Sequence, residues 1–213
     1  GPTTSRNTNN RLSGGISRSD GGTKNSDFIK RRLFYQGNFT TRYADMMWQA
    51  GITSQDYGAS TFYSAKFDNQ YEETRRYIAS ASAEIRPLGD KRLTISPTIY
   101  GHRDYDHYQL TRGMTGAANG ENLHRMDVYG ASISARLAWV AGQTAAGANI
   151  RREHILSTSY GDLLDEDQWH DISGSSRVYD HEGKRTCTSL FLEHKINIGG
   201  FRLSAGVMAD RKT

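Results

Sequence analysis

Apolar and polar residues alternate with a period of two through much of this chain, a pattern typical of β-strands with one apolar and one polar face. Over residues 77–85, Tyr77, Ala79, Ala81, Ala83 and Ile85 share one face, and the other face is mostly polar. The pattern recurs over 128–137 and 201–209. It predicts strands that turn only one face toward an apolar environment.

The spacing of these segments predicts a meander. Nine strands are expected, at residues 10–20, 31–41, 44–56, 74–86, 91–107, 122–138, 143–157, 184–198 and 201–212. Long connections, at about 21–30, 57–73, 108–121 and 158–183, alternate with short ones at 40–43, 87–90, 139–142 and 199–200. Tight turns at one end and long loops at the other are typical of an up-and-down membrane barrel. The predicted fold class is an all-β, antiparallel transmembrane β-barrel segment, with residues 1–213 forming one partial barrel domain.

Composition supports a barrel over the other classes. Only 36% of residues are hydrophobic and the mean hydropathy is −0.71, which is little for a soluble core, yet 10% are aromatic, which disfavours disorder. No apolar run is long enough for a membrane helix. About half of the aromatic residues near strand ends are expected to form an interfacial girdle, the candidates being Phe34, Tyr35, Tyr43, Trp48, Tyr77, Tyr100, Trp139 and Phe201.

Charge and chain ends add two further expectations. The formal net charge is +4 and the pI is near 9.2, but acidic residues are interspersed with the basic ones, so nucleic-acid binding is not expected. Residues 1–10 are polar and are expected to fray or to belong to a loop. No signal peptide opens the sequence, and an odd number of strands cannot close a bacterial barrel, so the chain is expected to be part of a larger one.

Several segments carry a resemblance to a known family. Residues 58–67 and 69–73, together with 12–15, 34–38, 124–130, 144–148 and 191–194, resemble the barrel of TonB-dependent outer-membrane receptors, in particular those of the vitamin B12 type. The resemblance implies a 22-stranded barrel in the outer membrane of a Gram-negative cell, closed by an N-terminal plug domain that is missing from this sequence.

The same resemblance implies partners. The receptor imports a large nutrient, first of all a corrinoid, with a siderophore or haem as the alternative. TonB is expected to act through the missing plug, the lipid bilayer surrounds the barrel, and a surface lipoprotein is a further partner left open. No cofactor is expected.

The connection from Tyr57 to Tyr71 is the main candidate binding segment, because long aromatic loops on a barrel are often functional. Its rings could stack on a planar ligand and its polar side chains could bind the ligand's edge. Packing of the loop against its neighbours explains the same residues equally well. The candidate ligand-binding residues are Tyr57, Phe62, Tyr63, Lys66, Asn69, Tyr71 and Arg112. Phe67 and Gln70 belong to the same loop, whereas Arg112 and Trp169 are single residues of other loops and are the weaker candidates.

Catalytic and metal sites are not expected. Strand alternation places His107 on the face opposite Asp104 and Asp106, and no nucleophile elbow is present, so a barrel hydrolase is the weaker alternative to a receptor. The acidic run Asp162, Asp165, Glu166 and Asp167 matches no calcium loop and is expected to be solvated. A soluble β interaction module also remains open.

Overall fold

The computed structural model describes residues 7–213 as one curved antiparallel sheet with a small two-stranded ribbon beside it. The large strands run in sequence order and are β1 (Asn7–Ser19), β2 (Phe28–Thr40), β3 (Ala44–Ser60), β4 (Gln70–Ile85), β5 (Leu93–Gln109), β6 (Glu121–Trp139), β7 (Gly142–Ser157), β11 (His181–Ile198) and β12 (Phe201–Lys212). The predicted fold class is confirmed, and the sheet is open in this chain, ending at β1 and β12.

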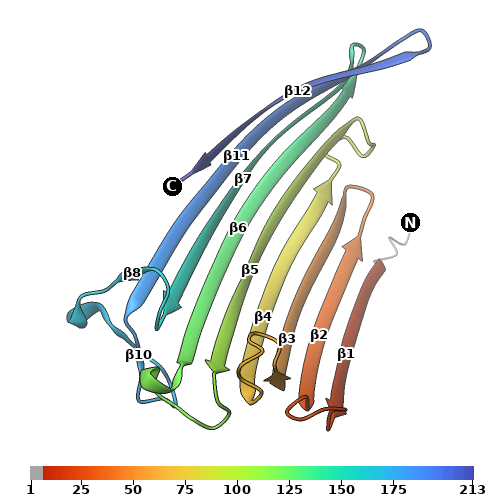
Figure 1. The fold of residues 1–213 in the computed structure, drawn as a ribbon. Helices are drawn as coiled ribbons and strands as arrows, with labels where there is room; N and C mark the ends of the chain where they lie inside the picture. Colours follow the sequence, from red (N-terminus) through yellow and green to blue (C-terminus); the bar gives the residue numbers. More distant parts are fainter. Residues whose placement is uncertain (1–6) are drawn as a thin grey trace.

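The alternation of long and short connections is also confirmed. All tight turns lie at one end of the sheet and all long loops at the other (Figure 1). Gly89 and Gly199 have φ of 72° and 60°, a conformation that favours glycine, at two of the turns. The loop between β7 and β11 carries the short pieces β8 (Asp162–Leu163), η2 (Glu166–Gln168), β9 (His170–Asp171) and β10 (Val178–Tyr179), and η1 (Ala117–Asn119) precedes β6. The sequence predicted none of these short elements.

Strand boundaries differ from the prediction mainly at the loop end. The expected loop over 57–73 is shortened to 61–69, because Tyr57 pairs with Glu72 and Gly58 with Tyr71 in the ladder. The register shifts between Gly58 and Ser60, which marks a bulge. At the other end of the chain, β1 already begins at Asn7, so the expected fraying over 1–10 was wrong for Asn7–Asn10; residues 1–6 lie outside the described part.

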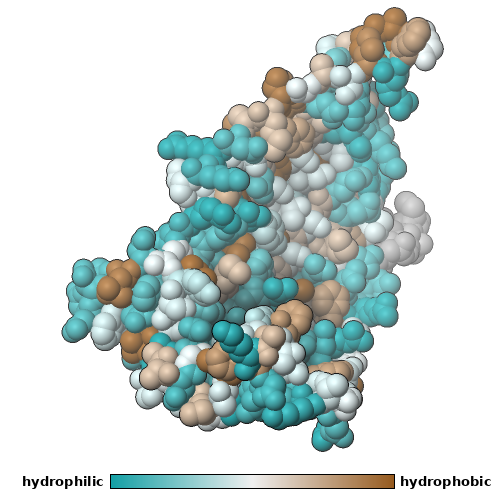
Figure 2. Space-filling model, in the orientation of Figure 1, coloured by the Kyte–Doolittle hydropathy of each residue, from teal (hydrophilic) through white to brown (hydrophobic). Residues whose placement is uncertain are grey.

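The register brings the apolar faces of successive strands to one side of the sheet, here called the apolar face. Ala81 pairs with Ile99, Ile99 with Ala131, and Ala131 with Ile150. The opposite side, the polar face, carries residues such as Ser80, Thr98, Ser132 and Asn149 on the same strands. The view in Figure 2 shows a hollowed surface with mostly hydrophilic and neutral residues, and with hydrophobic patches at both the turn end and the loop end.

The apolar face is largely uncovered. Ile99, Ile133 and Val207 are 62%, 52% and 71% exposed, whereas the buried hydrophobic residues of the described chain are few: Ala59, Leu123, Val128, Leu156 and Tyr179. A soluble protein of this size would cover such a surface, since large exposed apolar patches mark contact with a partner or a membrane. The sheet therefore has its hydrophobic surface on the outside instead of in a core.

Candidate functional site

On the side of the long loops the apolar face ends at charged residues, and the rest of it, here called the apolar band, has a similar length on successive strands. On β4, β6 and β12 it covers residues 77–85, 129–139 and 201–209, about nine to eleven residues each, the length a tilted strand needs to cross a bilayer. On the side of the loops the band ends at a charged residue on several strands, at Arg75 on β4, Arg103 on β5, Asp127 on β6, Arg152 on β7 and Arg211 on β12.

The edge of the band on the side of the long loops shifts toward the turns from one strand to the next. Arg103 lies opposite Tyr77, which is two residues closer to the turns than Arg75 along β4. Arg152 lies opposite Tyr129 and is closer to the turns by a further two residues. Strands that tilt relative to a membrane produce such a staircase, because a level plane cuts each successive strand at a different residue. The edge thus marks one plane across tilted strands.

Aromatic residues fall at both edges of the band, and five of the eight candidates lie on the apolar face: Tyr35, Trp48, Tyr77, Trp139 and Phe201. Tyr77 stands at the loop side, and Trp139 and Phe201 at the turn side, all on the apolar face. The register places Phe34 and Tyr100 on the polar face instead, which excludes them from a girdle. Alternation alone decides this, since neighbouring residues face opposite sides.

Beyond the band, the loop over 61–69 is tied to the polar face by a buried carboxylate. The hydroxyls of Tyr57 and Tyr63 both donate hydrogen bonds to Glu72, which is 8% exposed. The Tyr63 ring also packs edge-on against Tyr108, with 5.4 Å between ring centroids. Two of the predicted ligand-binding tyrosines therefore meet, and the residue that joins them, Glu72, was not among the candidates.

Gln70 fixes the backbone of the same loop from within. Its side chain is fully buried, and its Nε2 donates to the carbonyls of Ser60, Ser64 and Phe67 at 3.1, 3.3 and 2.8 Å. Its Oε1 accepts a hydrogen bond from the Tyr108 hydroxyl at 2.5 Å. Gln70 thus shapes the loop and has no free group for a ligand.

Arg112 joins three connections that are far apart in sequence. Its guanidinium makes a two-pronged contact with the Asp27 carboxylate at 2.7 and 3.0 Å, and lies 4.3 Å from the centroid of the Tyr71 ring. Its backbone N–H donates to the Asn69 carbonyl at 2.7 Å. The predicted residues Asn69, Tyr71 and Arg112 therefore form a second group.

The two groups lie on different faces. Tyr57 faces the polar side with its partner Glu72, and Tyr71 is next to Glu72 along β4 and so faces the apolar side. The structure does not bring Tyr57 and Tyr71 onto one surface. Phe62, Tyr63 and Lys66 remain at the exposed tip of the loop, where Phe62 is 81% exposed.

Electrostatics differ between the groups. Burial, together with the hydrogen bond to Glu72, raises the pKa of Tyr63 to about 12. Burial and the neighbouring Glu72 carboxylate raise the pKa of Asp106 to about 6; this residue lies on β5 beyond the end of the apolar band at Gly101. The Arg112 hydrogen bond lowers the pKa of Asp27. The polar-face cluster thus disfavours negative charge, and the Arg112 group favours it.

The long loop over 158–180 folds against the strands. Ile172 packs on the buried residues Leu123, Leu156 and Tyr179. The indole N–H of Trp169 donates a hydrogen bond to the Leu164 carbonyl at 3.1 Å, so it stabilises the conformation of the loop. This small cluster gives the loop a defined position.

The residues considered for catalysis lie as alternation predicts. His107 Nε2 is 2.8 Å from Glu121 Oε1, whereas Asp104 pairs with Arg76 on the opposite face. Within residues 7–213, no group of three or more His, Cys, Asp or Glu side chains is arranged to hold a metal ion, and this includes the acidic run near Asp165. No helix in the described part of the chain is long and apolar enough to cross a membrane.

Comparison with known proteins identifies the fold. The crystal structure of the ferric citrate transporter FecA in its unliganded form is similar to this chain, with a TM-score of 0.63 at 14% sequence identity. The similarity covers 99% of this chain. The fold is that of a TonB-dependent receptor barrel. The chain spans 36% of the length of FecA, so it corresponds to a part of such a barrel wall.

The sequence comparisons add no closer relation. No family model and no curated protein matches the sequence. The receptor-type barrel that this chain resembles belongs to a transporter and not to an enzyme.

Proposed function

We propose that this chain forms part of the wall of an outer-membrane TonB-dependent receptor that imports a large nutrient. The observation that carries the proposal is the apolar band, about nine to eleven residues wide on each strand, opposite a polar face. In such a receptor the band meets lipid, the polar face lines the lumen, and the long loops face the exterior. TonB acts on the receptor through its plug.

The nutrient binds at the outer end, where the loops gather. The candidate contacts are the exposed tip residues Phe62, Tyr63 and Lys66, which the buried Glu72 and Gln70 hold in place. Aromatic rings and a cation suit a large planar ligand with polar edges. Tyr57 supports this surface from β3, while Asn69, Tyr71 and Arg112 join the loops beside it.

The leading ligand class is a corrinoid, which the sequence resemblance favours. A ferric chelate is the second candidate, because the similar solved structure is that of a ferric citrate transporter. An external lipoprotein over the loops is a further proposed partner. Corrinoid and ferric chelate are distinguished by titrating cyanocobalamin and ferric citrate against the natural protein and following tryptophan fluorescence.

Variants at the loop tip test the location of the site. We expect Phe62→Ala and Tyr63→Ala to weaken binding of the preferred ligand by about tenfold or more, since a large buried aromatic contact contributes about 1–3 kcal/mol. Val140→Ala is the matched control, because Val140 is fully exposed in the turn at the opposite end of the sheet. Binding of neither ligand would refute the nutrient classes, and equal losses in all three variants would refute the site.

A further inference from the structure

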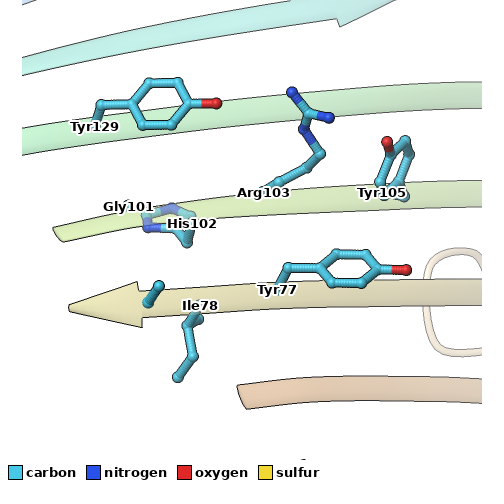
Figure 3. A pocket seen from close by; sticks show the side chains of 8 residues that line it. Tyr77, Ile78, Gly101, His102, Arg103, Tyr105 and Tyr129 are labelled. Carbon is cyan, nitrogen blue, oxygen red and sulfur yellow. The ribbon is translucent and has the colours of Figure 1, made fainter. Parts of the chain in front are cut away.

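A pocket of about 450 Å³ lies on the apolar face where the band meets the charged residues. It is lined by Tyr77, Ile78, Ala79, Gly101, His102, Arg103, Tyr105 and Tyr129 (Figure 3). Alternation and register place Tyr77, Arg103, Tyr105 and Tyr129 together on the apolar face. The pocket lies on the outside of the barrel wall, away from the loop tip proposed to bind the nutrient.

The floor of the pocket is a gap in the side-chain layer. Gly101 has no side chain, and its neighbour across the ladder is Ala79. A Cβ atom at position 101 would lie 3.1 Å from the Tyr129 ring, so the ring occupies the space that a side chain would need. The Tyr129 ring therefore lies over Gly101, next to the small side chain of Ala79.

The gap continues down the apolar band as a trough. Ala79, Ala81 and Ala83 follow one another on the apolar face of β4. Large residues flank Ala81 on both sides, Trp48 on β3 and Ile99 on β5. The short side chains of Ala79, Ala81 and Ala83 thus form an apolar strip along β4, here called the alanine trough, which suits contact with an extended hydrocarbon chain.

Arginine side chains surround the side of the pocket that is nearer the long loops. Arg103 and Arg125 both pair with the Asp127 carboxylate, which therefore balances only one of them. Arg75 and Arg152 are exposed, lie opposite the lining residues Tyr105 and Tyr129 in the ladder, and form no ion pair within residues 7–213. Arg75 and Arg152 therefore add two guanidinium groups near the mouth of the pocket that no carboxylate pairs with in the described chain. An anion is needed to complement this charge.

The tyrosine hydroxyls point to the same place. In Figure 3 the rings of Tyr77 and Tyr129 lie along their strands with the hydroxyls directed toward the loop end, on the side of Arg103. Rings in the apolar part and hydroxyls at its polar edge are typical of the membrane interface. On the side of the long loops, a neighbouring cleft of about 820 Å³ is lined by Ser173, Ser175 and Ser176, by Arg75 and Arg125, and by the carboxylates Glu73, Asp106, Glu121 and Asp171.

We propose that this pocket binds one membrane lipid whose head group carries phosphate, with the phosphate at the arginines and an acyl chain in the alanine trough. The inference rests on the proposed membrane-barrel function. A free anion explains the arginines but not the trough, and an uncharged lipid explains the trough but not the arginines. A phosphate-bearing lipid accounts for both features at their junction.

The test compares lipid binding by paired variants of the natural protein in detergent, measured by native mass spectrometry. The probe is dihexadecyl phosphate, with dihexadecylglycerol as the uncharged probe and inorganic phosphate as the soluble anion. Arg75→Gln with Arg152→Gln removes two guanidinium groups without leaving an unpaired carboxylate. The control is Arg11→Gln with Arg32→Gln, two exposed arginines on the polar face that form no ion pair in the described chain.

We expect dihexadecyl phosphate to bind the wild type and the control alike, and the Arg75/Arg152 variant to bind it roughly 30-fold more weakly. Ala81→Leu, which fills the trough, should also weaken binding without altering the charge. Equal loss in both arginine pairs, equal binding of dihexadecylglycerol, or displacement by inorganic phosphate would each overturn the lipid site.

Fractionation of cells separates this inference from the proposed function. A protein absent from the outer-membrane fraction contradicts both. A protein present there whose lipid binding does not depend on Arg75 and Arg152 contradicts only the lipid site.

Discussion

Lysine at position 133 tests the assignment of the two faces most simply. Ile133 lies within the β6 stretch of the apolar band, 129–139, and its register partners are Pro97 and Ala148, so no polar group is near on that face. It is 52% exposed, and therefore in contact with the surrounding medium. If the band spans a bilayer, Ile133 lies on the order of 10 Å below the loop-side edge, allowing for strand rise and tilt.

The expected cost follows from that depth. A lysine on the lipid face near the bilayer midplane costs about 2–4 kcal/mol, so Ile133→Lys should lower the equilibrium constant for folding by roughly 30- to 700-fold. Ser132→Lys is the matched control, because Ser132 is adjacent and faces the polar side. Its expected effect is within about 0.5 kcal/mol.

Urea unfolding of the natural protein in lipid vesicles, followed by tryptophan fluorescence, measures both differences. If Ser132→Lys lowered the free energy of unfolding as much as Ile133→Lys or more, the face assignment would be refuted. Equal small effects would show that neither face meets lipid.

Three further predictions concern the loop end. Arg112→Ala should speed amide hydrogen exchange over 20–27, because it removes the contact with Asp27. Lys66→Ala is the control and should leave this exchange unchanged, since the Lys66 side chain is exposed. Equal exchange rates in the two variants would contradict the role of the Arg112–Asp27 contact. Gln70→Ala should make the 61–69 loop sensitive to protease, and resistance equal to wild type would contradict its role. The pKa of Asp106 is raised to about 6 in the folded protein, so ionisation of this carboxyl group destabilises the fold as pH rises from about 4 to 6. Asp106→Asn should therefore raise Tm at pH 7.5 but not at pH 4.5. A change in Tm that is the same at both pH values would contradict this.

The sequence predicted those parts of the fold in which successive side chains face two different environments. Along residues 128–137 every second side chain is apolar, since one face meets an apolar medium and the other does not, and this gives a signal at period two. The turns could be located because residues such as Gly199 and Gly200 favour a reversal of the chain.

Strand ends beyond the band gave no such signal. Near Glu72 and His107 both faces are polar, so the ladder continues without alternation, and the expected loops were too long. Pairing of backbone groups, and not side-chain pattern, sets these ends.

The candidate site was only partly accessible from sequence. The aromatic residues of the 61–69 loop stood out by composition, but Asp27, the partner of Arg112, is far away along the chain and no local pattern connects the two. Likewise, nothing near Tyr63 in the sequence indicates that its hydroxyl binds Glu72. The lipid pocket depends on register across three strands, which places Ala79, Gly101 and Tyr129 side by side.

Spin-label accessibility along β6 tests the central claim most directly. Single nitroxide labels at positions 129–137, in a Cys187→Ser background of the natural protein in lipid vesicles, report collisions with oxygen in lipid and with a nickel chelate in water. A membrane wall predicts oxygen contact at 129, 131, 133, 135 and 137 and nickel contact at the positions between them. The same accessibility at neighbouring positions, or oxygen contact on the even-numbered face, would contradict it.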